Sequence, residues 1–481
     1  MYKNAGKHVI SGLVWGLMLL LFAVSCGKGE INVVRAVDRQ NMEMVVLRGD
    51  RTKLANFYDA DFVIVGGGLS GIAATLAACS SGRGTILVEE TDSIASCFAS
   101  PDTSEYFDNR FVETTGSSKR YIAFREKIKQ WYEARSEKQP VAFQPYFKTF
   151  EDFGTGNFCF NNDAAIDVIY DMIEQHIDRE RLTILNRHKI VKATEFGERL
   201  ASLEVVDLDN RVVSQVTGWM FIDASETGEL LSICKTEYTT GRESRGDTGE
   251  PHAPDTASHP GAKNYFLAEA GVDAGADNYV IDLLEEKPSD TAAEKITIET
   301  GSRRLKAYSQ ITEQDISAEF QSGPRARFFE DSVGIGYSLI TMFGSDSGVE
   351  PVIVPVKPFQ IPYSALISPL YSNLIAGGRA SGMTYVVSMA YNAPSVEWAL
   401  GESAGEIAAF CAGYNLNAHE LMNSAEDFNK FRERLVKDRG IPIYWYDDVS
   451  VDDPDFVEAQ LKPFGEPEYH GAAQTLHYFW N

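Results

Sequence analysis

The chain has 481 residues, of which 69 are Asp or Glu and 44 are Lys or Arg, so its formal net charge is −25. This length allows a large buried core and predicts two interwoven domains. The acidic excess argues against nucleic acid as a partner, because the phosphates of nucleic acid would be repelled.

The N-terminal segment has the pattern of an export signal. Two lysines precede an apolar run over residues 9–24, which leads to Ser25 and Cys26. A basic start, an apolar stretch and small residues at its end are typical of a secretory signal. The end of the segment resembles a bacterial lipoprotein processing site. We therefore expect an exported lipoprotein, in the periplasm or on the outer membrane or cell surface, which contacts the membrane only through a lipid on Cys26. An ordinary cleaved signal and an uncleaved membrane anchor are the alternatives.

The six cysteines lack the spacing of a metal site. They stand at positions 26, 79, 97, 159, 234 and 411, and no two form a C-x-x-C pair. Zinc sites and iron–sulfur clusters generally use such closely spaced ligands, so the sequence predicts no metal. Cys79 and Cys411 lie in apolar runs and are expected to be buried thiols rather than halves of disulfides.

The most informative motif lies between residues 61 and 75. An apolar run from Phe62 to Val65 has the composition of a buried strand and is too short for a helix. A G-x-G-x-x-G pattern follows, filled by Gly66, Gly67, Gly68, Leu69, Ser70 and Gly71. The first glycine of such a pattern allows a tight turn, and the second lets the backbone approach a pyrophosphate. The third lets the following helix, here predicted as far as about Cys79, pack closely on the strand.

A second strand and an acidic residue complete this unit. The run Thr85–Val88 is typical of a buried strand, and Glu89 follows it, 18 residues beyond Gly71. An acidic residue at this place accepts hydrogen bonds from the adenosine ribose of a dinucleotide. The unit is therefore predicted to bind a dinucleotide, the alternative being a purely structural turn.

The surrounding segments also show regular patterns. Residues 27–57 are expected to form a tether that packs partly on the domain. The predicted helices cover residues 119–135 and 163–176, and the predicted strands cover residues 33–34, 44–47, 182–185 and 203–206.

Two later strands end in small residues. One leads to Asp223 and Ala224, and the other to Gly378 and Arg379. The second precedes a helix over 395–411 that is rich in Ala and Gly, which is typical of close packing or of a helix N-terminus that faces a cofactor. In an open parallel sheet, ligands bind at the carboxyl ends of the strands. With the first glycine motif, these strand ends predict one large ligand across one edge of a sheet.

Taken together, these segments resemble FAD-dependent oxidoreductases with a glutathione-reductase-type fold, a group in which some bacterial members are labelled putative xanthan lyases. The resemblance runs in blocks from Ala60 to Phe456. It rests on Gly66–Gly71 with Glu89, Asp223–Gly228, Tyr238–Arg245, Thr248–His252, Ile361–Tyr363, Ala376–Arg379 and Tyr444–Asp447. In one place the chain departs from the group: members commonly have two glycines shortly after the acid of the second strand, where this chain has Ala95-Ser96-Cys97.

The resemblance implies a doubly wound, parallel-sheet FAD-binding domain of Rossmann type, an interleaved α+β substrate domain, and FAD as the cofactor. The expected boundaries are 58–100, 163–245 and 363–412 for FAD binding, 101–162 and 246–362 for the substrate, and 413–481 for a C-terminal segment. The expected cofactor-binding residues are Gly66, Gly67, Gly68, Leu69, Ser70, Gly71, Glu89, Asp223, Ala224, Gly378 and Arg379.

The loop around His252 offers candidates for catalysis. Flavin chemistry requires the protein to place the substrate and to take or give a proton. Histidine suits the second task because it titrates near neutral pH. We expect His252 to be the catalytic residue, with Arg242 as the partner of an anion or a flavin carbonyl and Glu250 orienting one of the two. The alternative is that Arg242 and Glu250 pair with each other and only hold the loop.

The predicted function is the transfer of a hydride between FAD and a small organic substrate, with saccharides and hydroxyl compounds as the candidate class. The alternative is an FAD-binding electron-transfer or carbohydrate-binding subunit of a cell-surface complex, without turnover of its own. The two differ in whether a small molecule alone reduces the bound flavin.

Overall fold

The computed structural model describes residues 54–95, 109–137, 163–257, 303–342 and 352–462, together with Phe160 and the backbone of a few short strands elsewhere. The predicted signal segment with Cys26, and the pair Ser96 and Cys97, lie outside this part of the chain. None of the helices in the described part combines the length and the apolar character that a membrane crossing needs.

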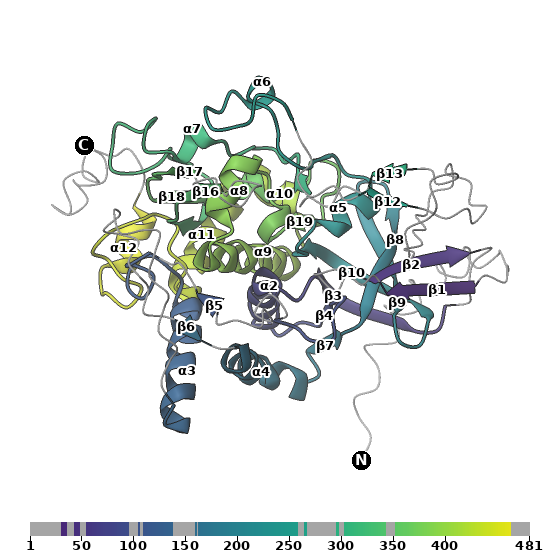
Figure 1. Ribbon diagram of the computed structural model, residues 1–481. Helices are drawn as coiled ribbons and strands as arrows, with labels where there is room; N and C mark the ends of the chain where they lie inside the picture. The colour runs from purple at the N-terminus through teal and green to yellow at the C-terminus, as the bar shows by residue number, and fades with distance from the viewer. Residues whose placement is uncertain are drawn as a thin grey trace, which may run out of the picture.

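A mixed sheet, at the right of the view in Figure 1, is the largest sheet in the described part of the chain. Its parallel strands are, in spatial order, β7 (Leu182–Leu185), β4 (Thr85–Val88), β3 (Phe57–Val65) and β10 (Val212–Asp223). Antiparallel pairings add β9 (Arg199–Asp207) and β8 (His188–Phe196), and β19 (Leu374–Ala376) pairs in parallel with the end of β10. The predicted α/β class with a parallel sheet is confirmed. Val65, Asp223 and Ala376 lie level, so three strands end side by side.

Both faces of the parallel strands are buried, which explains their continuous apolar runs. On β3, Phe62 and Ile64 belong to the core that contains α2 and α9, whereas Val63 and Val65 belong to the core on the other face. Alternate residues of a strand point to opposite faces, so a core on both sides requires a run without polar residues. Burial of one such Val or Ile side chain contributes roughly 1.5–3 kcal/mol.

Helices α2 (Leu69–Cys79) and α9 (Pro394–Tyr414) pack against each other beside the sheet (Figure 1). Their backbones come very close because α9 has glycine at the contact. A Cβ atom added to Gly401 would lie 1.9 Å from the Ser70 carbonyl oxygen, and one added to Gly405 would lie 2.4 Å from the Ala74 carbonyl oxygen. The small-residue helix predicted over 395–411 therefore provides close helix packing.

The other predicted helices and strands are also present. The further helices are α3 (Lys119–Arg135), α4 (Asn162–Asp178), α5 (Glu229–Ile233), α6 (Arg245–Thr248), α7 (Glu313–Ile316), α8 (Tyr385–Tyr391), α10 (Ala418–Asn423), α11 (Ala425–Arg439) and α12 (Phe456–Leu461), with 3-10 turns η2 (Tyr363–Ala365) and η3 (Gly378–Ala380). The smaller strands are β1 (Glu30–Arg35), β2 (Glu43–Arg48), β5 (Ser104–Glu105), β6 (Cys159–Phe160), β11 (Tyr238–Thr239), β12 (Asn264–Phe266), β13 (Lys295–Thr297), β14 (Arg304–Leu305), β15 (Ser332–Gly336), β16 (Ile340–Met342), β17 (Val352–Val354) and β18 (Phe359–Pro362). β1 and β2, in the segment predicted to be a tether, form an antiparallel pair.

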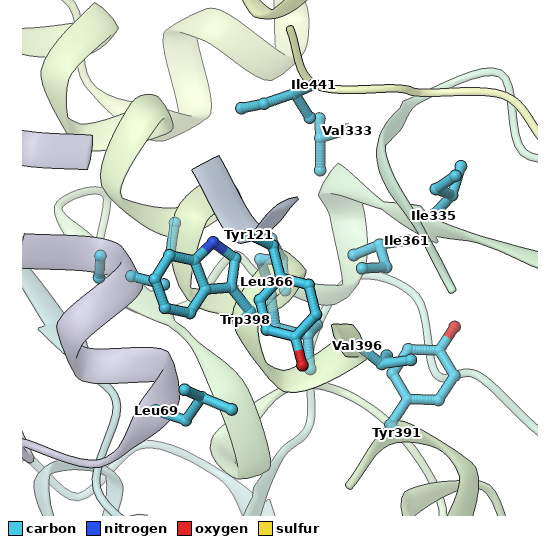
Figure 2. Close-up of a cluster of buried hydrophobic side chains, with 14 of the residues drawn as sticks. Leu69, Tyr121, Val333, Ile335, Ile361, Leu366, Tyr391, Val396, Trp398 and Ile441 are labelled. Atoms are coloured by element: carbon cyan, nitrogen blue, oxygen red, sulfur yellow. The ribbon is translucent and has the colours of Figure 1, made fainter. Parts of the chain in front are cut away.

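A packing centre surrounds Trp398 of α9, which is fully buried (Figure 2). Its ring stacks on Phe124 of α3 with 5.3 Å between the centroids, and Tyr121 of the same helix lies at 5.4 Å. Aromatic pairs of this kind add about 0.5–1.5 kcal/mol beyond the burial of their surface. These contacts fix α3 to the same helix that packs on α2.

Buried ion pairs join α3, α9 and α11. Glu402 of α9 pairs with Arg120, and Glu406 lies 3.3 Å from Arg434 and 2.9 Å from Arg439. Both glutamates are fully buried. A buried carboxylate is stable only when it is paired, so these arginines allow α9 to carry two acidic side chains inside the core.

The described cysteines are free, buried thiols. Cys79 and Cys411 have this state, as predicted, and so does Cys234. Burial raises the pKa of the Cys79 thiol to about 11 and that of Cys234 to about 12. Such thiols stay protonated at neutral pH and are poor nucleophiles.

Candidate functional site

The glycine motif forms a tight turn between β3 and α2. Gly66 has a φ of +101°, which L side chains rarely adopt, and an added Cβ would lie 2.5 Å from the Ala224 carbonyl oxygen. A Cβ on Gly71 would lie 1.8 Å from the Gly66 carbonyl oxygen. A side chain at either position would push α2 away from the strand ends, so the turn requires glycine at both.

The strand end of β19 reaches the same turn. Gly378, with a φ of +74°, lies so close to Ser70 that an added Cβ would stand 2.3 Å from the serine hydroxyl oxygen. The side chain of Leu69 points into the buried cluster around Trp398 (Figure 2). Residues 66–71, Ala224 and Gly378 thus come together at one edge of the sheet. We call this set the glycine cradle.

The N-terminus of α2 lies inside the glycine cradle and has no capping side chain. Its N-cap residue, Gly68, makes no side-chain hydrogen bond, and the first turn contains no acidic side chain. The first N–H groups of a helix lack partners within the helix and carry partial positive charge. A phosphate or diphosphate group is the kind of ligand that such a terminus binds.

Glu89 stands at the end of β4 and is almost fully buried. Its Oε1 accepts hydrogen bonds from the N–H and the hydroxyl of Thr91, at 2.8 and 2.6 Å, and its Oε2 accepts one from the Gly67 N–H at 2.5 Å. A carboxylate has about four acceptor positions, so one is left on Oε2 beside the glycine cradle. This arrangement leaves room for the predicted ribose contact, which stays a prediction.

Asp223 and Ala224 shape the turn after β10. The Asp223 carboxylate is fully buried and accepts hydrogen bonds from the N–H and hydroxyl of Ser225 and from the Leu231 N–H. Burial raises the pKa of Asp223 to about 6. Both carboxylate oxygens are engaged within the turn, so the side chain holds the loop in place. Ala224 contributes backbone: its N–H donates to Val65 at 2.8 Å, and its carbonyl lies against Gly66.

Two carboxylates that the sequence analysis did not select flank Arg379. The Nε of Arg379 lies 3.0 Å from Glu226 Oε2, and its terminal nitrogen lies 3.9 Å from Glu397 Oε2. Glu226 also borders the glycine cradle, because its Oε1 lies 2.6 Å from where a Cβ on Gly68 would stand. Their positions in the sequence could have indicated them as site residues. Glu226 closely follows the end of β10, and Glu397 lies in the first turn of α9.

His252 is held by a glutamate that the sequence analysis missed. Its ring Nδ1 lies 2.5 Å from Glu313 Oε1, and its backbone N–H donates to Glu313 Oε2 at 3.1 Å. The Glu313 side chain is fully buried, whereas that of His252 is 31% exposed. The hydrogen bond at Nδ1 leaves Nε2 as the ring nitrogen that can reach a ligand.

The Glu250 carboxylate bonds neither His252 nor Arg242 in the described part of the chain. It is fully buried, and its Oε1 accepts the Glu313 N–H at 2.7 Å and the Thr384 hydroxyl at 2.5 Å. Burial raises the pKa of this carboxyl. Glu313, and not Glu250, therefore holds the His252 ring, and Glu250 instead links the loop to the start of α8.

Arg242 lies over the ring of Tyr385, with 5.1 Å between the guanidinium carbon and the ring centroid. The neighbouring Glu243 pairs with the buried Arg304 at 2.8 Å and accepts the Tyr385 N–H at 3.0 Å. The alternative pairing of Arg242 with Glu250 is not found among the described residues. The three predicted residues nevertheless lie near one another. Arg242 and Glu250 contact the start of α8, and Glu250 and His252 contact Glu313 at the start of α7.

Comparison with known families identifies the chain. A family described as "FAD dependent oxidoreductase" matches it over residues 61–300 and 301–435. The chain belongs to this family. The protein is therefore an FAD-dependent oxidoreductase, and FAD, the cofactor that the resemblance implies, is confirmed. A comparison with curated proteins gave no match.

Several solved structures are distantly similar to this oxidoreductase. A geranylgeranyl bacteriochlorophyll reductase-like protein from Thermoplasma acidophilum shares 12% identity, with a TM-score of 0.34, over 80% of this chain and 84% of its own. A mutant of E. coli quinol fumarate reductase FrdA shares 13% identity, with a TM-score of 0.31, over 80% and 75%. The rebeccamycin biosynthetic enzyme RebC with reduced flavin shares 11% identity, with a TM-score of 0.33, over 79% and 65%.

The glycine cradle fits FAD. The N-terminus of α2 would hold the diphosphate, and the remaining acceptor position of Glu89 would hold a ribose hydroxyl. At the place where the group commonly has two glycines, Ala95 has a φ of +65° and donates its N–H to the Gly67 oxygen at 2.8 Å. The backbone there adopts the left-handed conformation that glycine favours, although the residue is alanine.

Proposed function

We propose that this oxidoreductase moves a hydride between FAD and a small organic substrate of the saccharide or hydroxyl class, with His252 as the catalytic residue. Bound FAD supplies the group that exchanges the hydride, while the protein must place the substrate and handle its proton. The observation that carries this proposal is the partly exposed His252 side chain, held by the buried Glu313.

His252 is suited to accept a proton. A hydroxyl substrate that gives up a hydride from carbon must also lose the proton of its hydroxyl group. With Nδ1 donating to Glu313, the lone pair of Nε2 is available for that proton. The negative charge of Glu313 then stabilises the resulting imidazolium, and its two hydrogen bonds keep the ring in one orientation.

Arg242 would anchor the substrate. Its guanidinium lies on the Tyr385 ring, and the backbone N–H of Tyr385 donates a hydrogen bond to Glu243. A cation held against an aromatic ring, without a carboxylate partner among the described residues, is available to bind an acidic group. Substrates that carry a carboxylate beside a hydroxyl group should therefore be preferred over their neutral counterparts.

The test is the absorption spectrum of the full chain, purified in mild detergent, during anaerobic addition of alcohols, sugars and their acid derivatives. We expect at least one compound to bleach the oxidised-flavin band, with an acid more effective than the matching neutral compound. The reverse reaction is followed by reoxidation of chemically reduced protein with the matching carbonyl compounds, and free FAD is the control. Bound flavin that none of these compounds reduces or reoxidises would instead support an electron-transfer or carbohydrate-binding subunit.

We also propose that the protein is exported and anchored through a lipid on Cys26. The basis is the sequence pattern that ends at this residue. Expression in a bacterial host with a radioactive fatty acid should label the wild-type protein but not Cys26→Ser. Label that persists in the variant would exclude this anchor.

A further inference from the structure

A charge cluster at the rim of the glycine cradle has no part in the function proposed above. The guanidinium of Arg379 lies between two carboxylates, 3.0 Å from Glu226 and 3.9 Å from Glu397. With all three groups ionised, the cluster has one net negative charge. The Glu226 carboxylate also lies against Gly68, the N-cap residue of α2. The cluster is therefore next to the helix terminus that attracts an anion.

A bound diphosphate would add negative charge at this place. Like charges in a partly buried site repel each other more than in water, and salt screens them less. The cluster therefore opposes the same group that the N-terminus of α2 attracts. This opposition ends when one of the two carboxylates takes up a proton, because the cluster is then neutral.

Glu397 is the carboxylate suited to take up that proton. Its side chain is 7% exposed, compared with 44% for Glu226. Burial raises the pKa of Glu397 to about 7, an effect that Arg379 opposes and Glu226 reinforces. Glu397 is thus near the midpoint of its titration at neutral pH, and a further anion nearby favours its neutral form.

In the described part of the chain, the other elements packed on α9 place no comparable charge at Glu397. α2, α8, β15 and β19 contain no Asp, Glu, His, Lys or Arg, and their titratable groups are Cys79, Tyr385 and Tyr391. β10 contributes Asp223, whose oxygens are engaged in its own turn. The remaining charged groups on or against α9 include Glu402 with Arg120, Glu406 with Arg434 and Arg439, and His419 and Glu420 of α10.

We propose that the cluster of Glu226, Arg379 and Glu397 couples FAD binding to the uptake of one proton, so that the protein binds FAD more tightly below neutral pH than above it. Below pH 7 Glu397 is already neutral, and binding needs no proton. Above pH 7 Glu397 is ionised in the free protein and must take a proton from solvent when FAD binds, so the affinity for FAD falls as the pH rises. The fall ends once the pH exceeds the pKa of Glu397 in the complex. By linkage, bound FAD raises this pKa.

The test is the dissociation constant of FAD, measured by quenching of flavin fluorescence from pH 6 to pH 8.5. The protein is the full chain in mild detergent, stripped of flavin. If FAD raises the pKa of Glu397 by about one unit, the wild-type constant rises about tenfold over this range. Glu397→Gln resembles the protonated acid, so it should bind tightly at every pH. Glu402→Gln, a buried carboxylate elsewhere on α9, is the matched control and should keep the wild-type slope.

Two further measurements do not depend on the folding of the Glu397 variant. Calorimetric titration of the wild-type protein with FAD at pH 7, in buffers of different ionisation enthalpy, should show net uptake of a fraction of a proton. Glu226→Gln changes a half-exposed side chain and should tighten binding at pH 8.5. The proposal would be overturned by any of three results. These are a dissociation constant that does not vary with pH, the absence of proton uptake, and a folded Glu397→Gln variant whose dissociation constant depends on pH as in the wild type.

Discussion

The glycine cradle and the loop around His252 are built in opposite ways. In the glycine cradle, the absence of side chains sets the geometry, because a Cβ on Gly71 or Gly378 would lie 1.8 or 2.3 Å from an oxygen atom. In the loop, buried side chains set the geometry: Glu250 and Glu313 are both fully buried and bond groups from other segments. The first site should therefore be sensitive to added volume, and the second to removed charge.

This difference has a physical basis. A close backbone contact has no flexible atoms that could move aside, so one extra methyl group displaces a whole helix. A buried carboxylate is costly unless each oxygen is hydrogen-bonded, so the loop keeps its conformation only while these bonds persist. The predictions below separate the two sensitivities.

The largest effect is expected from Gly401→Ala, at the contact between α9 and α2. The new Cβ would lie 1.9 Å from the Ser70 carbonyl oxygen, in the first turn of the helix whose N-terminus would hold the diphosphate. The free energy of unfolding should fall by about 3 kcal/mol, at the upper end of the cost of overpacking. Bound flavin should be lost on gel filtration. Urea titration and the ratio of flavin to protein absorbance measure the two effects.

Gly413→Ala is the matched control on the same helix. A Cβ at Gly413 would meet no atom within 4 Å. Alanine favours the helical conformation over glycine by about 1 kcal/mol, so this variant should be slightly more stable and should keep its flavin. If Gly401→Ala and Gly413→Ala lose the same amount of stability and flavin, the close contact at Gly401 is not the cause of the loss. Such a result would show that α9 tolerates no substitution of its glycines.

The sequence predicted the parts of the molecule that depend on local patterns. The strand Thr85–Val88 and the helix Lys119–Arg135 have their predicted bounds, and the strands end beside the glycine cradle as expected. Glycine spacing, apolar runs and strand ends are all properties of neighbouring residues. The residue types there are dictated by backbone conformation, so the pattern and the structure correspond directly.

The sequence did not predict the partners that come from distant segments. Glu313 holds His252 from 61 residues away, and nothing beside Glu313 in the chain distinguishes it from a solvated glutamate. Glu250 is predicted to orient His252 or Arg242, but its carboxylate accepts hydrogen bonds from Thr384 and the Glu313 N–H instead. Pairings of this kind follow from tertiary packing, which a single sequence does not display.

The next largest effect is expected from His252→Gln. Loss of a general base typically lowers a rate by a factor of about 100 or more. The turnover number with the best substrate from the anaerobic panel should fall by this amount. Flavin content should stay unchanged, because His252 takes no part in the glycine cradle. A variant with unchanged turnover would remove His252 from the mechanism, and one without flavin would show that the two sites are not independent.

A smaller effect is expected from Glu313→Gln, which keeps the shape of the side chain and removes its charge. Loss of a charge-assisted hydrogen bond to His252 corresponds to about a tenfold lower kcat. KM and flavin content should not change, since the Glu313 side chain is fully buried and is expected to act only through His252. Glu319→Gln, an exposed glutamate shortly after α7, is the control and should behave as wild type. A change in KM alone would indicate a purely structural role.

The smallest effect is expected from Ala95→Gly. This substitution removes a methyl group, whereas Gly401→Ala adds one at a different position. Three contributions nearly cancel. Relief of the left-handed conformation at φ +65° stabilises by about 1–2 kcal/mol. The more flexible unfolded chain costs about 0.4–1 kcal/mol, and loss of one buried methyl group costs about 0.8 kcal/mol. The free energy of unfolding, measured by urea titration, should therefore change by less than about 1 kcal/mol. A large loss of stability would mean that the fully buried methyl group of Ala95, rather than the backbone conformation, fixes this turn.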